Sequence, residues 1–160
     1  MNIYKNFLPN ENINLINKIM TSDSFPWYFR PTQVNNSTKD TPFLSHTFFN
    51  NGDKNSNAFF LIEPILKKLK VKNILSIRAN LCLKGPFHCD WHVDDFTENL
   101  KHNTAIYYLN TNNGYTEFKN KKIKCEKNKI VVFKADKQHR AVGQTDEPIR
   151  MVINFNYESN

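Results

Sequence analysis

The chain has 160 residues, 39% of them hydrophobic and 13% aromatic, a composition typical of a globular domain with its own core and unlike that of a disordered chain. Its 22 Lys and Arg outnumber 15 Asp and Glu, and the net charge of +7 leaves an anionic partner such as nucleic acid open. Three cysteines without CxxC spacing cannot all pair, which favours a reducing cytoplasm. No apolar run reaches membrane-spanning length and no basic-then-apolar leader opens the chain, so we expect neither a membrane segment nor a signal peptide.

Two stretches in the first half of the chain have apolar residues at helical spacing. One runs from Asn10, its expected N-cap, to about residue 20. The other covers residues 58–69, where Pro64 either starts or interrupts the helix. We expect both helices to pack against a sheet and support it.

Short aromatic runs and polar loops lie around these helices. Residues 25–29 and 43–49 predict strands. His46 lies in the second run, and a single histidine among aromatic side chains is more typical of a hydrogen-bonded structural residue than of a metal ligand. The polar stretches 31–42 and 50–57 predict loops; they are candidates for a substrate lid, and ordinary surface linkers are the simpler interpretation.

From residue 74 the pattern changes to that of strands. Apolar or alternating runs separated by Gly, Asn, Asp and Pro cover residues 74–83, 104–110, 115–118, 121–125, 129–134 and 149–157. The lysines between residues 119 and 129 alternate with polar and apolar residues, as on the solvated face of a hairpin. We therefore predict an α+β, mainly β fold. It would be a cupin-like jelly roll, or double-stranded β-helix, over residues 74–157, buttressed by the helices and loops of residues 1–73 within one domain, 1–160.

An alternating run of imidazoles and carboxylates, His88-Cys89-Asp90-Trp91-His92-Val93-Asp94, is the most informative stretch of the chain. In an extended conformation its His and Asp side chains share one face, and Cys89, Trp91 and Val93 share the other. Burying several unpaired charges is costly, so a bound metal is the economical explanation. A His-x-Asp unit supplies an imidazole and a carboxylate, and a second histidine would complete the facial triad that suits non-haem Fe(II). The run contains two overlapping His-x-Asp units, and spacing alone excludes neither.

Two residues of the second half are candidates for completing such a site. His139 follows the strand 129–134 and can supply the second imidazole. Arg150 begins the last strand, and its guanidinium can bind the distal carboxylate of a dicarboxylic cosubstrate through two parallel charge-assisted bonds. Taken singly, a histidine in a loop and an arginine near a strand end are more typical of surface polar residues.

The order of these motifs resembles that of a known family. The segments are His92-Val93-Asp94, Ile106-Tyr107-Tyr108-Leu109-Asn110, Gly114-Tyr115-Thr116-Glu117-Phe118, His139 and Arg150. Together they resemble the core of the Fe(II)/2-oxoglutarate-dependent oxygenases and are most similar to the prolyl-4-hydroxylase-like branch, including its small phage and marine-bacterial members. The resemblance covers about residues 74–157, roughly half of the chain.

The resemblance implies a dioxygenase with Fe(II), 2-oxoglutarate and O2 as cofactor and cosubstrates, releasing succinate and CO2. It implies that His92, Asp94 and His139 bind Fe(II). It further implies that Arg150 pairs with the C5 carboxylate of 2-oxoglutarate and that Tyr108 hydrogen-bonds the same carboxylate. No catalytic side chain beyond the metal centre is implied.

Two features depart from or complicate the family pattern. The family's spacing to Tyr108 favours the later His-x-Asp unit, so His88 and Asp90 would contact the ligands or line the substrate cleft; simple solvent exposure is an equally good interpretation. Cys82 stands where prolyl-hydroxylase-like members often carry a tyrosine near the cosubstrate. Asn80 shares the expected strand face with Cys82 and is a candidate contact for 2-oxoglutarate. The simplest role for Cys82 is that of a small buried hydrophobe.

The substrate is predicted least directly. The branch resemblance implies hydroxylation of a protein side chain such as proline, in the cytoplasm, or in the host-cell cytoplasm if the gene is phage-encoded. A nucleic-acid-acting oxygenase is an alternative that would use the net charge of +7. A non-enzymatic metal-binding jelly-roll module is another, although such a module has no use for a carboxylate clamp. The sequence does not predict the oligomeric state.

Overall fold

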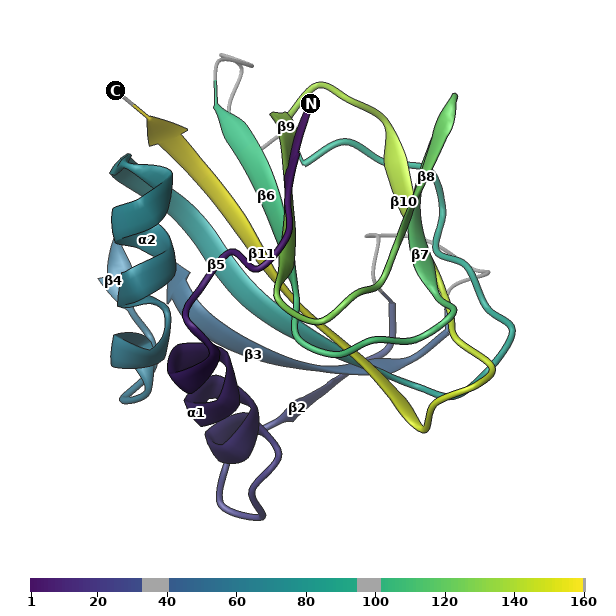
Figure 1. Ribbon diagram of the computed structural model, residues 1–160, viewed down its shortest axis with the longest axis horizontal. Coiled ribbons are helices and arrows are strands. Elements are labelled where there is room, and N and C mark those ends of the chain that lie inside the picture. Colours follow the sequence, from purple (N-terminus) through teal and green to yellow (C-terminus); the bar gives the residue numbers. More distant parts are fainter. Residues whose placement is uncertain (33–40, 95–101, 160) are drawn as a thin grey trace.

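The computed structural model describes residues 1–32, 41–94 and 102–159, which form two sheets and two helices (Figure 1). The helices are α1 (Asn10–Met20) and α2 (Glu63–Leu69), preceded by the 3-10 turn η1 (Phe59–Leu61). The strands are β1 (Asn2–Tyr4), β2 (Tyr28–Arg30), β3 (Phe43–Asn50), β4 (Asp53–Lys54), β5 (Val71–Leu83), β6 (Asn103–Tyr108), β7 (Tyr115–Phe118), β8 (Lys121–Lys124), β9 (Lys129–Lys134), β10 (His139–Val142) and β11 (Ile149–Ser159).

The strands form one large and one small antiparallel sheet. The large sheet has eight strands in the order β1-β9-β6-β11-β5-β3-β2, with β4 paired to β3. The small sheet has the order β10-β7-β8. Figure 1 shows the small sheet on one side of the large one and both helices on the other. The predicted mainly β, double-sheet jelly roll supported by N-terminal helices is therefore confirmed.

The outer face of the large sheet packs against the helices. Helix α1 buries Ile13, Ile16 and Met20, which recur at the spacing of one helix face. On the sheet, alternate residues of β11 such as Ile153 and Phe155 enter the same apolar core and are fully buried. Each such side chain contributes roughly 1.5–3 kcal/mol by leaving water. Within the described residues, neither helix is long and apolar enough to cross a membrane.

The inner face of the large sheet faces the small sheet and is mixed in character. One part is an apolar cluster that includes Val131 and Phe133 of β9 and Phe118 of the small sheet. Strand β11 pairs Arg150 with Cys82 and Val152 with Tyr108, so the side chains of these pairs point to this inner face. The residues expected to bind the cosubstrate thus share the inner face with an apolar core.

Several element predictions needed correction. Asn10 is the first helical residue of α1 and not its N-cap; Pro9 precedes it, and no side chain caps the helix. The aromatic strand predicted over 25–29 is confined to β2 (Tyr28–Arg30). Strands β1 and β10 were not predicted, because both are short and form only through pairing with β9 and β7. Most of the loop predicted over 31–42 lies outside the described residues.

His46 has the structural role expected from its sequence. Its Nδ1 lies 2.8 Å from the carbonyl oxygen of Pro26, and its Nε2 lies 2.7 Å from the hydroxyl oxygen of Ser56. The ring also packs against Phe25 at a centroid distance of 4.4 Å. With both ring nitrogens bonded inside the fold, His46 ties the segments on either side of β3 together.

Candidate metal centre

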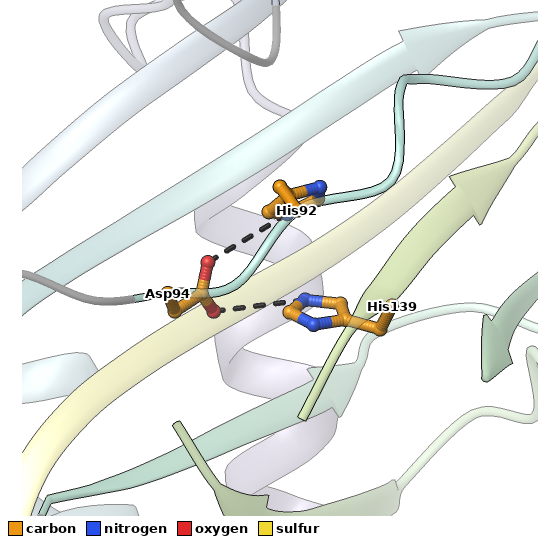
Figure 2. A group of neighbouring side chains, drawn as sticks. All are labelled: His92, Asp94 and His139. Atoms are coloured by element: carbon orange, nitrogen blue, oxygen red, sulfur yellow. Dashed lines mark ion pairs between the residues drawn. The ribbon is translucent and has the colours of Figure 1, made fainter. Parts of the chain in front are cut away.

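Three side chains converge in the described part of the chain: His92, Asp94 and His139. Their ligand atoms all lie within 4.8 Å of one another. Asp94 Oδ1 is 3.6 Å from His92 Nε2, and Asp94 Oδ2 is 3.7 Å from His139 Nε2. Figure 2 shows each carboxylate oxygen facing one imidazole ring. Two ligands bound at about 2.1 Å can be at most about 4.2 Å apart, and both distances from Asp94 to a histidine lie below this limit, so the carboxylate can share an ion with each ring.

Backbone pairing brings the two histidines together from distant parts of the chain. The His92 amide donates to the His139 carbonyl at 3.0 Å, and the His139 amide donates to the His92 carbonyl at 2.9 Å. The two rings lie 4.5 Å apart between centroids. His139 does not lie in a loop, as the sequence suggested, but begins β10, where it pairs with Phe118 of β7. The site is therefore held by main-chain hydrogen bonds.

The ring orientations leave the Nε2 atoms for a metal. His92 Nδ1 lies 2.9 Å from the Asp90 carbonyl oxygen, and His139 Nδ1 lies 3.1 Å from the Lys137 carbonyl oxygen. Because a carbonyl can only accept, each Nδ1 carries a proton, and Nε2, the ring nitrogen that lies toward Asp94, is the atom that each neutral ring would offer to a metal. Burial lowers the pKa of His139, an effect that Asp94 opposes and His92 reinforces. The site thus favours the neutral imidazole that binds metals.

His102 holds the backbone at the carboxylate and was not singled out from the sequence. It is almost fully buried, and its Nε2 lies 2.7 Å from the carbonyl oxygen of Asp94. This hydrogen bond fixes the main chain that carries the carboxylate. His102 lies in no motif of the sequence, because its role depends on a single hydrogen bond to the backbone of Asp94.

His88 and Asp90 lie outside this cluster. The run 88–94 is not a regular strand: within it only His88 and His92 form isolated bridges. The predicted two-face alternation is wrong, because Cys89 is buried while Trp91, expected on the same face, is 40% exposed. The Asp90 carbonyl oxygen accepts a hydrogen bond from His92 Nδ1, a contact that lies within the run itself and is not part of a strand ladder. His88 is exposed, and Asp90 contributes its backbone oxygen to the site.

Arg150 is buried on the inner face of β11 and is only 2% exposed. Its Nε donates to Cys125 Sγ at 3.1 Å, and Cys82 lies directly opposite in the strand register and hydrogen-bonds the guanidinium. None of the ion pairs formed among the described residues includes Arg150. Leaving a buried charge without a carboxylate costs several kcal/mol, so the site is suited to a ligand carboxylate.

Tyr108, Asn80 and Cys82 surround this arginine on neighbouring strands. Tyr108 is fully buried and its hydroxyl donates to Thr116 Oγ1 at 2.8 Å. Burial raises the pKa of Tyr108, so the phenol stays neutral, and its single proton, donated here to Thr116, would turn to a ligand carboxylate to bind it. Asn80 pairs with Val152 across the strands, and its buried Oδ1 has no hydrogen-bond partner among the described residues. Cys82 is a small buried residue as expected, and it also contacts the guanidinium.

Comparison with known proteins identifies similar sequences and folds. A family model described as the 2OG-Fe(II) oxygenase superfamily matches residues 78–158. No curated protein sequence matches the chain. A prolyl-4-hydroxylase from Pseudomonas putida is 14% identical, with a TM-score of 0.57 over 99% of this chain and 92% of that one.

Two further solved structures resemble the fold. A viral collagen prolyl hydroxylase from Paramecium Bursaria Chlorella virus-1, solved as a 2OG complex, is 14% identical, with a TM-score of 0.65 over 99% of this chain and 95% of that one. A prolyl hydroxylase from Trichoplax adhaerens, bound to a hypoxia inducible factor peptide fragment, is 12% identical, with a TM-score of 0.64 over 98% of this chain and 82% of that one. At these identities the likeness is one of fold.

Proposed function

The chain belongs to the 2OG-Fe(II) oxygenase superfamily, and from this premise we propose which of its residues bind the cofactor and cosubstrate. In the proposal, His92, Asp94 and His139 bind Fe(II), and Arg150 with Tyr108 binds the C5 carboxylate of 2-oxoglutarate. The observation that carries it is the pairing of a converged His-Asp-His cluster with a buried arginine that forms no ion pair among the described residues. A facial set of two imidazoles and one carboxylate suits Fe(II) and leaves coordination positions open.

The enzyme is an oxygenase that uses Fe(II), 2-oxoglutarate and O2. When bound, the iron and 2-oxoglutarate supply the oxidising chemistry, in which the cosubstrate is converted to succinate and CO2 and an oxygen atom reaches the substrate. The protein contributes unprotonated Nε2 atoms on two histidines and the negative charge of Asp94, which offsets the charge of the metal. Arg150 fixes one end of the cosubstrate, and the walls of the jelly roll exclude water from that end.

The proposed reaction is hydroxylation of a protein side chain such as proline. This proposal is supported by the branch of the family that the motifs resemble. It is also supported by the likeness in fold to a prolyl-4-hydroxylase and to a prolyl hydroxylase that binds a peptide fragment. Incubation with proline-containing peptides, followed by mass spectrometry for a gain of one oxygen atom, tests it directly.

A nucleic-acid substrate is the second candidate. It is favoured by the net charge of +7 and by the exposed lysines of β8, Lys121, Lys122 and Lys124. Phosphate contacts weaken steeply as salt rises, so oligonucleotide binding would fall sharply between low and physiological salt. Binding that is absent at low salt would remove this candidate. A non-enzymatic metal-binding module is disfavoured, because such a module needs no carboxylate clamp like Arg150.

The cosubstrate site is tested by anaerobic addition of Fe(II) and 2-oxoglutarate to the purified protein. We expect a weak visible charge-transfer band from the chelate. The band should vanish in His92→Ala and weaken in Arg150→Ala, and it should persist in Arg140→Met, which changes an arginine of the small sheet that pairs with Glu117 at 2.7 Å. Metal binding without any band in the wild type would contradict the proposal.

We also propose that residues 1–160 form one oxygenase domain that acts in the cytoplasm, or in the host-cell cytoplasm if the gene is phage-encoded. Shared packing supports the first part, since Phe7 and Leu8 near the N-terminus enter the same core as the central strands. The second part is supported by the three cysteines, all buried and none joined in a disulfide within the described residues. A single cooperative unfolding transition would be expected of one domain.

A further inference from the structure

A polar cavity of about 240 Å³ lies beside Asp94 on the inner face of the large sheet. It is lined by Arg30, Thr47, Asn50, Ser76, Arg78, Asp94, Asn154 and Asn156. Strand pairing builds its floor, because Arg78 lies opposite both Thr47 of β3 and Asn154 of β11. This cavity touches the same carboxylate as the proposed metal, so a molecule bound in it lies next to the metal centre.

The cavity walls contain two guanidinium groups that form no ion pair with a described residue. None of the ion pairs formed by the described residues includes Arg30 or Arg78. Arg30 uses its Nε to donate to Ser45 Oγ at 3.1 Å, and the Arg78 guanidinium lies 5.9 Å from the centroid of the Phe43 ring. Within the described part of the chain, these contacts position each guanidinium and leave several of its N–H donors for a ligand.

Asp94 is the acidic residue among the described residues that line the cavity, and it cannot neutralise both arginines once the metal is bound. Burial lowers the pKa of Arg78; Asp94 opposes this effect and Arg30 reinforces it, so the two cations repel each other across the cavity. The Asp94 carboxylate is already directed at His92 and His139 through its two oxygens. A metal held there offsets the charge of Asp94, and the cavity is then left with two like charges.

The remaining lining also favours a charged or strongly polar ligand. The Oδ1 of Asn154 is buried without a hydrogen-bond partner among the described residues, and as an acceptor it would take an N–H or O–H donor that lies beside the anionic group of a ligand. Asn156 accepts a hydrogen bond from the Thr104 hydroxyl on its Oδ1 at 2.9 Å, which fixes the amide and keeps its N–H donors for other partners. All eight lining residues are polar or charged. An apolar proline ring would gain little by entering such a cavity, since pockets for apolar groups are lined mainly by hydrophobic side chains.

From these contacts we propose that the substrate carries an anionic group, a carboxylate or a phosphate, which binds between Arg30 and Arg78 while the carbon to be oxidised faces the metal. The inference rests on the proposed function, because it takes Asp94 as a metal ligand. It refines that function: the substrate portion in the cavity is acidic or directly adjoins an acidic group. Bidentate hydrogen bonding from a guanidinium suits both carboxylate and phosphate oxygens.

The test uses the full chain, labelled with 15N and loaded with diamagnetic Zn(II) and 2-oxoglutarate. Sodium phosphate, sodium acetate and neutral acetamide are titrated separately at constant ionic strength. We expect phosphate or acetate to shift the Arg78 Nε–Hε resonance and the side-chain amide resonances of Asn154 and Asn156 in a saturable way. Acetamide should leave them in place. The anion that binds with the higher affinity indicates whether the charged group of the substrate is a phosphate or a carboxylate.

Two variants and one control make the result specific. Arg78→Met should weaken anion binding at least tenfold, and Arg30→Met, on the edge strand β2, should weaken it as well. Arg140→Met should respond like the wild type, because Arg140 lies on the small sheet. No saturable shift in the wild type, an equal response to acetamide, or unchanged binding in both Arg78→Met and Arg30→Met would each overturn the inference.

The Fe(II)–2-oxoglutarate band, measured on the same proteins, distinguishes a failure of the anion-binding inference from a failure of the proposed function. A band in the wild type without anion binding in the cavity would contradict the inference and would still support the proposed function. Absence of the band would remove the proposed function itself. If the band were lost in Arg78→Met and unchanged in Arg150→Ala, Arg78 would be the residue that binds 2-oxoglutarate. That result would overturn the inference.

Discussion

The two faces of the large sheet come from the same strands and are stabilised in different ways. On the outer face, Ile77 of β5 and Phe155 of β11 are fully buried against the helices. On the inner face, Arg78 of β5 and Arg150 of β11 carry charges that form no ion pair among the described residues. The outer face therefore stabilises the fold, and the inner face carries groups whose partners must come from ligands. Changes on the outer face should lower stability, and changes on the inner face should remove function.

The largest functional effect should come from His139→Ala on the inner side. Removing one of three proposed ligands should weaken Fe(II) binding by a factor on the order of 100 or more and abolish turnover, because even residues that only support metal ligands contribute about 10–100-fold. Anaerobic metal titration measures the affinity, and 2-oxoglutarate-dependent succinate formation measures turnover. His88→Ala is the matched control, since His88 is exposed and outside the cluster. Equal losses in both variants would mean that the cluster had been assigned to the wrong histidines.

The largest stability effect should come from Phe155→Ala on the outer side. Phe155 is fully buried, so truncation leaves a cavity and should lower the free energy of unfolding by about 3–5 kcal/mol. Urea denaturation of the metal-free protein gives this value. Phe29→Ala serves as the control: Phe29 is 67% exposed and its truncation should change stability by less than about 0.5 kcal/mol. A loss of under 1 kcal/mol in Phe155→Ala would show that the helices do not seal this face.

Arg150→Met should weaken cosubstrate binding without lowering the stability of the metal-free protein. Removing a buried charge that lacks a carboxylate partner should leave the free energy of unfolding of the metal-free protein equal or higher, because apolar replacements of buried charges are often neutral or stabilising. The affinity for 2-oxoglutarate should fall by about 2–5 kcal/mol, the usual cost of losing one member of a buried charge pair. Denaturation and cosubstrate titration measure the two quantities. A strongly destabilised Arg150→Met protein would mean that the chain itself supplies the partner.

The sequence predicted those features that depend on local pattern. The strands of the second half other than β10 were predicted because turn residues mark their ends, and the order of His92, Asp94, His139 and Arg150 pointed to the right family. The extended face proposed for residues 88–94 failed, because a period of two presumes a regular strand and this run forms only isolated bridges at His88 and His92. Spacing along the sequence therefore suggested four candidate ligands in this run. The fold brings only two of them, His92 and Asp94, into the described cluster with His139.

Features that depend on strand register were not predictable. Arg30 and Arg78 are far apart in sequence and come to line one cavity only because β2, β3 and β5 are neighbours in the sheet. His102 likewise acts through one bond to the backbone of Asp94. Each of these residues looks like an ordinary polar residue until the pairing of the strands is known, and that pairing is set by long-range packing.

The smallest effect that distinguishes the two faces is a pH dependence of stability on the outer face. His46 lies on that face, paired with Ala79, and burial lowers its pKa below the ordinary value of 6.5, an effect that the Pro26 carbonyl partly opposes. Below pH 6.5 the unfolded chain therefore binds a proton more readily than the folded protein does. The stability linked to His46 is fully present above pH 6.5 and is lost as the pH falls toward the lower pKa of the folded state.

Replacing the imidazole should remove this contribution to the pH dependence. In His46→Gln, the free energy of unfolding should fall less steeply between pH 6.5 and pH 5 than in the wild type, although its value at pH 8 is lower because the bonds to Pro26 and Ser56 are weakened. Urea denaturation of the metal-free protein at each pH gives the two slopes. The exposed Phe29 supplies the control, since Phe29→Leu changes no titratable group and should reproduce the wild-type slope. Identical slopes in all three proteins would show that the outer face, like a purely apolar core, does not respond to protons.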